Sequence, residues 1–277
     1  VFTILDPIND AYTNYLSLSY ELSEPLREGT ITWTALNSAK DPESPRMITM
    51  ELDEMIEGVS SDIVLKNMTS LVDSVTYNIK MEGSDLATNV GIPFVVSNVH
   101  YDFSPPIITL THPANNTYQS KTYFNYQITE DLLYGQVSWI QLYTRGVKPD
   151  TVILKGAELI AGINDSIIFT DMKKLKDGAS YDIIFEGYDL AKNEAIPKRI
   201  TNVTYDFTPP YIDLQYPQTL SSVNNINISY ELSEFLLEGT ATWKWVDGVL
   251  DTREHVQTLA PFEREIGQKN FILIQDS

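Results

Sequence analysis

The most constraining feature of this sequence is an internal repeat. Tyr101-Asp-Phe-Ser-Pro-Pro106 recurs 104 residues later as Tyr205-Asp-Phe-Thr-Pro-Pro210. Further blocks recur in the same order: Tyr20–Glu24 with Tyr126–Glu130 and Tyr230–Glu234, Gly29–Trp33 with Gly135–Trp139 and Gly239–Trp243, and Asp85–Asn89 with Asp189–Asn193. Recurrence at a fixed period is typical of a chain built from copies of one structural unit. We therefore expect three domains, at residues 1–103, 104–207 and 208–277, called repeats 1, 2 and 3 below.

Within a repeat, apolar side chains occur at every second residue. Leu16, Leu18, Tyr20 and Leu22 alternate with polar residues, as in a strand with one buried and one solvated face. In repeat 1 the pattern predicts seven strands, A to G, at residues 2–6, 15–22, 29–36, 47–52, 62–67, 75–83 and 92–103. Seven short strands in about 100 residues predict an immunoglobulin-like β-sandwich.

Two details of the pattern agree with this fold. A tryptophan recurs in the middle of strand C, as Trp33, Trp139 and Trp243, where we expect it to be core, and Trp245 should share its inward face. The spacing of Asp73 and Tyr77, repeated by Asp177 and Tyr181, predicts a tyrosine corner before strand F.

The predicted fold class is all-β, with tandem seven-stranded immunoglobulin-like sandwiches arranged as an extended rod. The Pro105-Pro106 and Pro209-Pro210 linkers cannot pair in a sheet and hold the chain extended. Repeat 3 is expected to be incomplete, because Ser277 corresponds to a position of repeat 2 ahead of strands F and G. Its inner apolar face would then need strands from further residues or from another polypeptide.

The composition excludes several classes of function. Asp and Glu number 38 against 19 Lys and Arg, so the net charge is −19. Such a surface repels nucleic acid and anionic membranes and attracts cations, so we expect neither a nucleic-acid partner nor direct membrane insertion. The sequence has no cysteine, which excludes disulfides and thiolate metal sites.

The repeat resembles the bacterial-type immunoglobulin-like repeats of large cell-surface proteins and adhesins. The residues that carry the resemblance are the Asp-Phe-Ser/Thr-Pro-Pro junction, the Asp-Leu-Ala-x-Asn loop and the Leu-Ser-Glu block followed by Gly-Thr-x-Thr-Trp. The resemblance implies repeats that act as stalks or spacers, often stiffened by Ca²⁺ at the junctions. Similar modules occur in surface-layer proteins.

Acidic loops supply the candidate metal site. In a sandwich of this kind the B–C and F–G loops lie where the chain enters, beside the exit of the preceding repeat. Oxygen ligands should converge there, as Ca²⁺ requires, although Asp189 and Asn193 could equally cap a tight turn. The candidate ligands are Asp102, Glu130, Asp131, Asp189 and Asn193 at the first junction, with Glu24, Asp85, Asn89, Asp206 and Glu234 at equivalent positions.

Other chemistry has weaker support in the sequence. The three histidines occupy unrelated positions in the repeat and pair with no nucleophile at a recognisable spacing, so an enzyme is not expected. Asn-x-Ser/Thr triplets offer candidate glycosylation sites at Asn67, Asn115, Asn164, Asn202 and Asn227.

The expected function is a structural spacer in an extracellular cell-surface protein. The partners considered are the neighbouring repeats and other copies of the chain. Ca²⁺ is the one cofactor considered. Two alternatives stay open, a surface-layer lattice protein and a carbohydrate-binding accessory module of a secreted enzyme. Many more copies of the repeat in the full gene would favour the stalk, whereas an adjacent catalytic domain would favour the accessory module.

Overall fold

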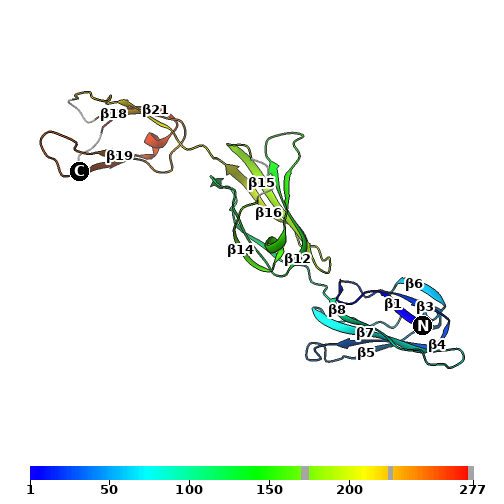
Figure 1. The fold of residues 1–277 in the computed structure, drawn as a ribbon. Helices are drawn as coiled ribbons and strands as arrows, with labels where there is room; N and C mark the ends of the chain where they lie inside the picture. The colour runs from blue at the N-terminus through cyan, green and yellow to red at the C-terminus, as the bar shows by residue number, and fades with distance from the viewer. Residues whose placement is uncertain (170–174, 224–226, 274–277) are drawn as a thin grey trace. The chain divides into compact units, whose positions relative to one another are not determined.

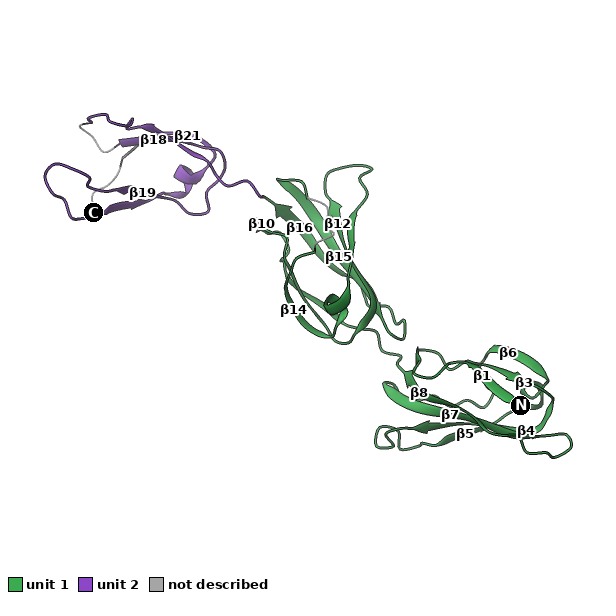
Figure 2. Cartoon of the chain, viewed as in Figure 1, with its two compact units in different colours: residues 1–206 green, residues 207–277 purple. Residues whose placement is uncertain are grey.

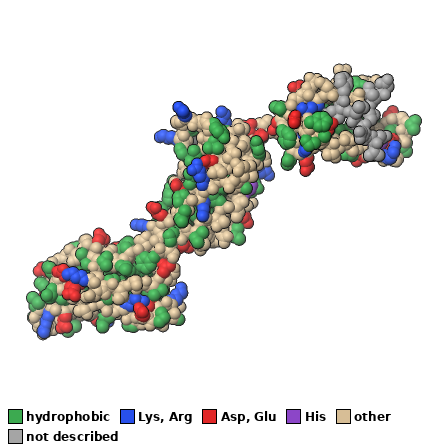
Figure 3. Space-filling view, turned by 180° about the vertical axis from the view of Figure 1, so that it is seen from behind, with side chains coloured by type: hydrophobic (Ala, Val, Ile, Leu, Met, Phe, Trp, Pro, Cys, Tyr) green, Lys and Arg blue, Asp and Glu red, His purple; other side chains and the backbone are tan. Residues whose placement is uncertain are grey.

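The computed structural model describes residues 1–169, 175–223 and 227–273, with only the backbone of 271–273. The chain consists of two compact units, Val1–Asp206 and Phe207–Ser277 (Figure 2). Unit 1 holds repeats 1 and 2 and unit 2 corresponds to repeat 3. On the face drawn in Figure 3, acidic side chains are scattered over both units, in keeping with the even spread of acidic residues along the sequence.

Repeat 1 is a sandwich of two sheets whose strands pair mostly in the antiparallel direction (Figure 1). One sheet has the order β1-β3-β6 and the other the order β2-β8-β7-β4-β5. The short strand β2 pairs in parallel with β8, and the remaining pairs are antiparallel. The strands are β1 (Phe2–Asp6), β2 (Tyr12–Thr13), β3 (Leu18–Leu22), β4 (Leu26–Ala35), β5 (Arg46–Thr49), β6 (Gly58–Ile63), β7 (Val75–Asp85) and β8 (Phe94–Tyr101).

The fold class is as predicted, an all-β chain of tandem immunoglobulin-like sandwiches, but repeat 1 differs from the seven predicted strands in two places. The short strand β2 was not predicted, so the repeat has eight strands. The strand β5, near the range predicted for strand D, pairs with β4 at the edge of the larger sheet. The strand predicted at 62–67 is wrong by about four residues, because β6 pairs with β3 through Gly58–Ile63. Leu65, inside the predicted range, is a buried loop residue that packs into the core.

Repeat 2 has the same two sheets, ordered β9-β11-β14 and β10-β16-β15-β12-β13. The equivalence extends to register, since Trp33 lies opposite Ile79 in repeat 1 and Trp139 opposite Ile183 in repeat 2. The strands are β9 (Ile108–His112), β10 (Tyr118–Gln119), β11 (Phe124–Ile128), β12 (Leu132–Gln141), β13 (Asp150–Ile153), β14 (Gly162–Ile167), β15 (Ala179–Asp189) and β16 (Lys198–Tyr205).

Each sandwich of unit 1 has a core centred on its strand-C tryptophan. Trp33 and Trp139 are 0% and 1% exposed, which confirms the prediction that they are core residues. Each indole Nε1 donates a hydrogen bond to a buried tyrosine hydroxyl on the last strand, Trp33 to Tyr101 and Trp139 to Tyr205, both at 3.2 Å. Since a buried indole N–H needs a partner, this bond recurs with the tryptophan.

The predicted tyrosine corners are present in both repeats. The Tyr77 hydroxyl accepts a hydrogen bond from the backbone N–H of Val72 at 3.1 Å, and that of Tyr181 accepts one from Lys176 at 2.9 Å. These bonds pin the loop before strand F to the strand itself.

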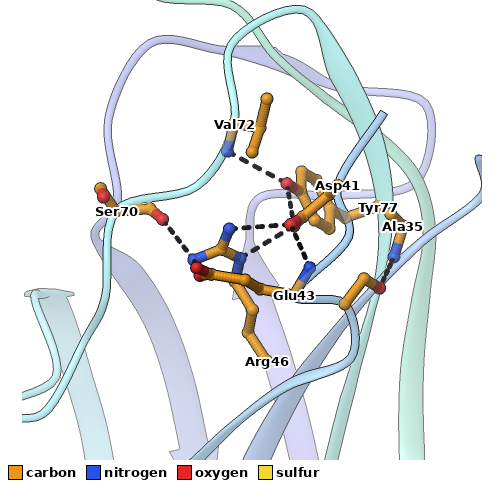
Figure 4. Close-up of polar contacts among 8 residues, drawn as sticks. Ala35, Asp41, Glu43, Arg46, Ser70, Val72 and Tyr77 are labelled. Atoms are coloured by element: carbon orange, nitrogen blue, oxygen red, sulfur yellow. Dashed lines mark hydrogen bonds and ion pairs between the residues drawn. The ribbon is translucent and has the colours of Figure 1, made fainter. Parts of the chain in front are cut away.

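Repeat 1 adds a buried ion pair to its corner (Figure 4). Tyr77 also donates to the carboxylate of Asp41, which is fully buried and accepts two hydrogen bonds from the Arg46 guanidinium at 2.8 Å each. The Arg46 hydrogen bonds and the Tyr77 hydroxyl outweigh burial and lower the pKa of Asp41 to about 2. The network ties the loop between β4 and β5 to strand β7.

Unit 2 has a three-stranded sheet, β17-β18-β21, facing a two-stranded sheet, β19-β20. Tyr230 of β18 donates to the Glu263 carbonyl, as Tyr20 donates to Glu54 and Tyr126 to Glu158 in unit 1. The strands are β17 (Ile212–Tyr216), β18 (Asn227–Leu232), β19 (Thr240–Trp243), β20 (His255–Thr258) and β21 (Gly267–Leu273).

Of the two tryptophans of unit 2, one lies as predicted on the inner face and the other does not. Trp243 is partly buried and packs against the small core around Tyr230 and Leu232. Trp245 is 43% exposed, so the expectation that it shares the inward face is wrong. Side chains two residues apart share a face only within a continuous strand, and β19 ends at Trp243.

Candidate metal site at the junction of repeats 1 and 2

Three carboxylates far apart in the sequence meet where repeat 1 leads into repeat 2. Asp102 follows strand β8, Glu130 lies in the turn between β11 and β12, and Asp189 ends β15. One carboxylate oxygen from each lies within 4.8 Å of the others. The structure thus brings together three of the five residues that the sequence proposed for this junction.

The three carboxylates repel one another. Burial, followed by the nearby charges of Asp102 and Asp189, raises the pKa of Glu130 to about 7. In the part of the chain that the structure describes, no lysine or arginine forms an ion pair with any of the three. The cluster is therefore an electronegative site at which a cation would relieve the repulsion.

The donor chemistry of the cluster fits a hard cation. All three side chains offer oxygen, which is the ligand that Ca²⁺ prefers. Ca²⁺ takes about six to eight oxygens, so backbone carbonyls or water would have to complete its shell. Ca²⁺ binding at this cluster remains a prediction.

Asn193 closes a turn with Asp189. The Asp189 carboxylate accepts hydrogen bonds from the backbone N–H and the side-chain Nδ2 of Asn193, both at 2.8 Å. Asp85 and Asn89 make the same pair of bonds in repeat 1, at 2.8 and 2.7 Å. Each Asp-x-x-x-Asn loop is thus a turn closed by its own side chains, which was the alternative left open from the sequence.

The Asn193 side chain also joins the two repeats. Its Nδ2 donates a second hydrogen bond, at 2.8 Å, to the backbone carbonyl of Asp102, and its Oδ1 accepts one from Asn14 at 3.0 Å. Asp102 and Asn14 belong to repeat 1, so the amide uses both of its polar ends across the junction. Asn193 is 7% exposed, whereas the equivalent Asn89 is exposed.

A second aspartate holds the segment that leaves repeat 1. The Asp73 carboxylate accepts hydrogen bonds from the backbone N–H of Phe103 and the hydroxyl of Ser104. The sequence marked Asp73 only as part of the tyrosine corner and gave no reason to single out Asn14.

The remaining candidate ligands lie outside the cluster. Asp131 accepts a hydrogen bond from the backbone N–H of Ala161 at 2.7 Å and faces that loop. Glu24, the repeat 1 equivalent of Glu130, is exposed. Asp206 and Glu234 are both partly buried and belong to different units.

The candidate glycosylation sites differ in accessibility. Asn67 and Asn115 are exposed, whereas Asn164, Asn202 and Asn227 are partly buried in strands. The Asn67 side-chain amide donates to Glu51, and the Asn115 side-chain oxygen accepts from the backbone of Thr201. Asn67 and Asn115 are thus the more accessible of the five sites, and their modification remains a prediction.

Comparisons with known proteins find no family and only distant similarity to solved structures. No protein-family model matches the chain, and no curated protein matches it. Similar solved structures include the FN1–FN3 domains of chicken CNTN1, at 9% identity and TM-score 0.33, covering 72% of this chain and 66% of that one. Fibronectin(III)-like modules of Clostridium thermocellum CbhA align at 13% identity and TM-score 0.34, covering 74% and 94%. A two-domain fibronectin type-III segment of chicken tenascin aligns at 14% identity and TM-score 0.27, covering 72% of this chain and 95% of that one.

Among the described residues, no helix has the length and apolarity needed to cross a membrane. The chain is, on its own topology, a modular tandem of immunoglobulin-like β-sandwiches.

Proposed function

We propose that this chain supplies non-catalytic spacer repeats to an extracellular cell-surface protein. The observation that carries the proposal is the Asn193 bridge, which hydrogen-bonds repeat 2 to Asp102 and Asn14 of repeat 1. A spacer must keep its modules from folding back on one another, and a linker of few residues with two prolines restricts them further. In the proposed array, successive repeats extend the chain, and other parts of the protein bind its targets.

The histidines support a non-catalytic role, because each makes an ordinary structural contact. His100 stacks on Tyr12 and hydrogen-bonds Thr76, and His112 stacks on Tyr123. His255, the first residue of β20, pairs with Asp251 in the loop before that strand. The Thr76 hydroxyl does meet the His100 ring, but among the described contacts no carboxylate hydrogen-bonds to that ring as in a catalytic triad.

We further propose that Ca²⁺ at Asp102, Glu130 and Asp189 stiffens this junction. The support is the approach of three carboxylates within 4.8 Å and the raised pKa of Glu130. When bound, Ca²⁺ would neutralise the mutual repulsion of these groups, and the side chains would hold the exit of repeat 1 against two loops of repeat 2.

Calorimetric titration with Ca²⁺ tests this proposal, with Glu130→Gln as the variant and Glu24→Gln as its matched control. We expect Ca²⁺ binding to be lost or at least about tenfold weaker in Glu130→Gln, since one charged ligand is removed. Binding should be unchanged in Glu24→Gln, because Glu24 is exposed at the other end of repeat 1. Absence of Ca²⁺ binding to the unmodified chain would contradict the proposal and leave the hydrogen-bonded junction as the account of stiffness.

Sedimentation separates the spacer from the surface-layer alternative. A spacer is expected to stay monomeric as its concentration rises with Ca²⁺ present, whereas a lattice protein would associate laterally. A carbohydrate-binding module would instead retain a polysaccharide in affinity electrophoresis. Association or retention would each favour its own alternative over the spacer.

A further inference from the structure

The larger sheet of repeat 2 carries a hollow on its outer face, between the end of β15 and the segment that leads to β16. It encloses about 220 Å³, and its lining includes Tyr134, Tyr188, Glu186 and Glu194. Strand alternation places the tyrosines on the face opposite the core, since Val137 is fully buried. The two rings stack, with centroids 5.3 Å apart and planes 18° apart. The hollow thus offers aromatic surface beside two carboxylates.

The backbone holds these side chains in place. Tyr134 on β12 lies opposite Tyr188 on β15. A Cβ at Gly187, the residue before Tyr188, would lie 2.7 Å from the Tyr134 carbonyl oxygen, so glycine is needed where the two strands meet. The Ala195 N–H donates to the Gly187 carbonyl at 2.9 Å. This bond lays the segment that carries Glu194 along the end of β15.

Hydrogen bonds orient one of the two carboxylates. The Tyr134 hydroxyl donates to Gln136 Oε1, and Gln136 Nε2 donates to Glu186 Oε2, both at 2.7 Å. In the part of the chain that the structure describes, neither Glu186 nor Glu194 forms an ion pair. The hollow therefore holds two uncompensated negative charges beside the rings.

Repeat 1 has a hollow at the equivalent place, with a different set of side chains. Its lining includes Glu28, Glu82 and Ser84, and Glu82 pairs with Lys80 at 2.8 Å. In repeat 2 the equivalent residues are Tyr134 for Glu28, Ile184 for Lys80, Glu186 for Glu82, Tyr188 for Ser84 and Glu194 for Val90. Repeat 2 thus keeps one carboxylate, gains another, lacks the lysine and has two aromatic rings.

A guanidinium group suits this combination of side chains. It is planar and always charged, it stacks on aromatic faces, and its fork of N–H donors pairs with carboxylates. A lysine ammonium has no such planar fork. A neutral sugar would leave both negative charges uncompensated. The net charge of −19 attracts a basic partner and repels a second copy of the chain.

We propose that this hollow of repeat 2 binds an arginine side chain of a basic partner protein. The guanidinium stacks on the tyrosine pair, and its N–H groups donate to Glu186 and Glu194. Since both carboxylates are accessible to solvent, the contact weakens as the salt concentration rises. The site adds a docking point on one repeat to the spacer role and uses none of the three carboxylates assigned to Ca²⁺.

Amide NMR of the isotope-labelled chain, titrated with N-acetyl-arginine-methylamide at low salt, tests the proposal. We expect weak, saturable shifts at Gly187, Tyr188 and Ala195. Combining Glu186→Gln with Glu194→Gln should weaken binding at least about fivefold, because both charge partners are lost. The matched control, Glu82→Gln in repeat 1, should leave binding unchanged.

A second pair of variants tests the ring. Tyr134→Ala should weaken binding about threefold, whereas Tyr134→Phe keeps the aromatic face and should retain most of it. Unchanged amide positions across residues 1–103 verify that each variant is folded. If binding in Tyr134→Ala equals that of the unmodified chain, the ring takes no part and the proposal fails.

Two further probes separate an arginine site from other ligands. N-acetyl-lysine-methylamide should bind more weakly than the arginine probe, and methyl α-glucoside should cause no shifts. Absence of shifts with the arginine probe would overturn the proposal. Shifts caused by the glucoside alone would also overturn it, since the hollow would then be a sugar site. Equal affinity of the arginine probe for the hollow around Glu82 would show unspecific attraction to acidic groups and would overturn it as well.

Discussion

Trp139 lies at the centre of repeat 2, in contact with two phenylalanine rings. Phe124 and Phe169 meet it edge-on, at ring-centroid distances of 6.1 and 5.9 Å. Its replacement by alanine should lower the free energy of unfolding of repeat 2 by about 3–5 kcal/mol, because it leaves a large cavity and removes the indole donor to Tyr205. Denaturant titration measures the loss. Trp245→Ala, at an exposed position, should change stability by less than about 0.5 kcal/mol, and an equal loss in both variants would contradict the assigned core.

The lowered pKa of Asp41 predicts that the stability of repeat 1 falls at acid pH. Its pKa is about 2 in the folded chain against an ordinary value of 3.8, so the folded state favours the ionised carboxylate. The stabilisation is present above pH 4 and is lost as the pH falls through the folded pKa, toward pH 2. Asp41→Asn should remove that part of the acid transition and cost about 2–4 kcal/mol near neutral pH, because Arg46 loses its buried partner.

The control for Asp41 is Asp53, which pairs with Lys66 at the surface. Both members of that pair are more than half exposed, so Asp53→Asn should be nearly neutral. Urea unfolding at pH 7, 4 and 2.5 measures all three proteins. A similar acid transition in the wild type and Asp41→Asn would rule out this carboxylate as its source.

The residues that sequence reasoning placed correctly are those whose role is set locally or by the repeat. Trp33 and Trp139 could be assigned because strand alternation fixes their face, and Tyr77 and Tyr181 because the corner has a fixed spacing. Asp41 and Arg46 occur only in repeat 1, and their pairing depends on the fold of a loop. No local pattern distinguishes such a pair from two surface charges.

At the scale of elements, the Asp-x-x-x-Asn loop is used twice in different surroundings. Asn89 and Asn193 make identical turn bonds, but Asn193 alone also bonds to Asp102 and Asn14. Asn193→Ala should therefore lower stability by about 1–2 kcal/mol more than Asn89→Ala, since it removes two further buried or partly buried hydrogen bonds. Thermal unfolding of the two variants provides the comparison. Equal losses would mean that the bridge contributes nothing beyond the turn.

The elements also show where prediction from sequence reached its limit. The pairing of strands C and F could be anticipated from the fold class, but the pairing of β5 with β4 was not predicted. An edge strand of four residues carries little pattern that would indicate its partner. In the same way, the convergence of Asp102, Glu130 and Asp189 followed from which loops share one end of a sandwich. The engagement of Asn193 with Asn14 depends on side-chain geometry across the junction, which the loop order leaves open.

At the scale of the whole molecule, one sandwich is repeated along the chain. Repeats 1 and 2 close their cores and share a hydrogen-bonded junction. Unit 2 keeps the same tyrosine anchor, in which Tyr230 donates to the Glu263 carbonyl. The repeat in the sequence was sufficient to predict the cores of repeats 1 and 2, because equivalent blocks imply equivalent cores. Because the net charge is −19, we expect the stiffness of the carboxylate-rich junction to depend on salt concentration and on cations.

The most direct test of the central claim is the distance distribution between spin labels on repeats 1 and 2. The chain has no cysteine, so Met47→Cys and Ile163→Cys label exposed positions on β5 and β14 without competing sites. With Ca²⁺ present, we expect a single narrow distribution that broadens when Asn193→Ala is added. A distribution equally broad with and without Asn193 would show that the two repeats move independently, and would contradict the proposed stiff junction.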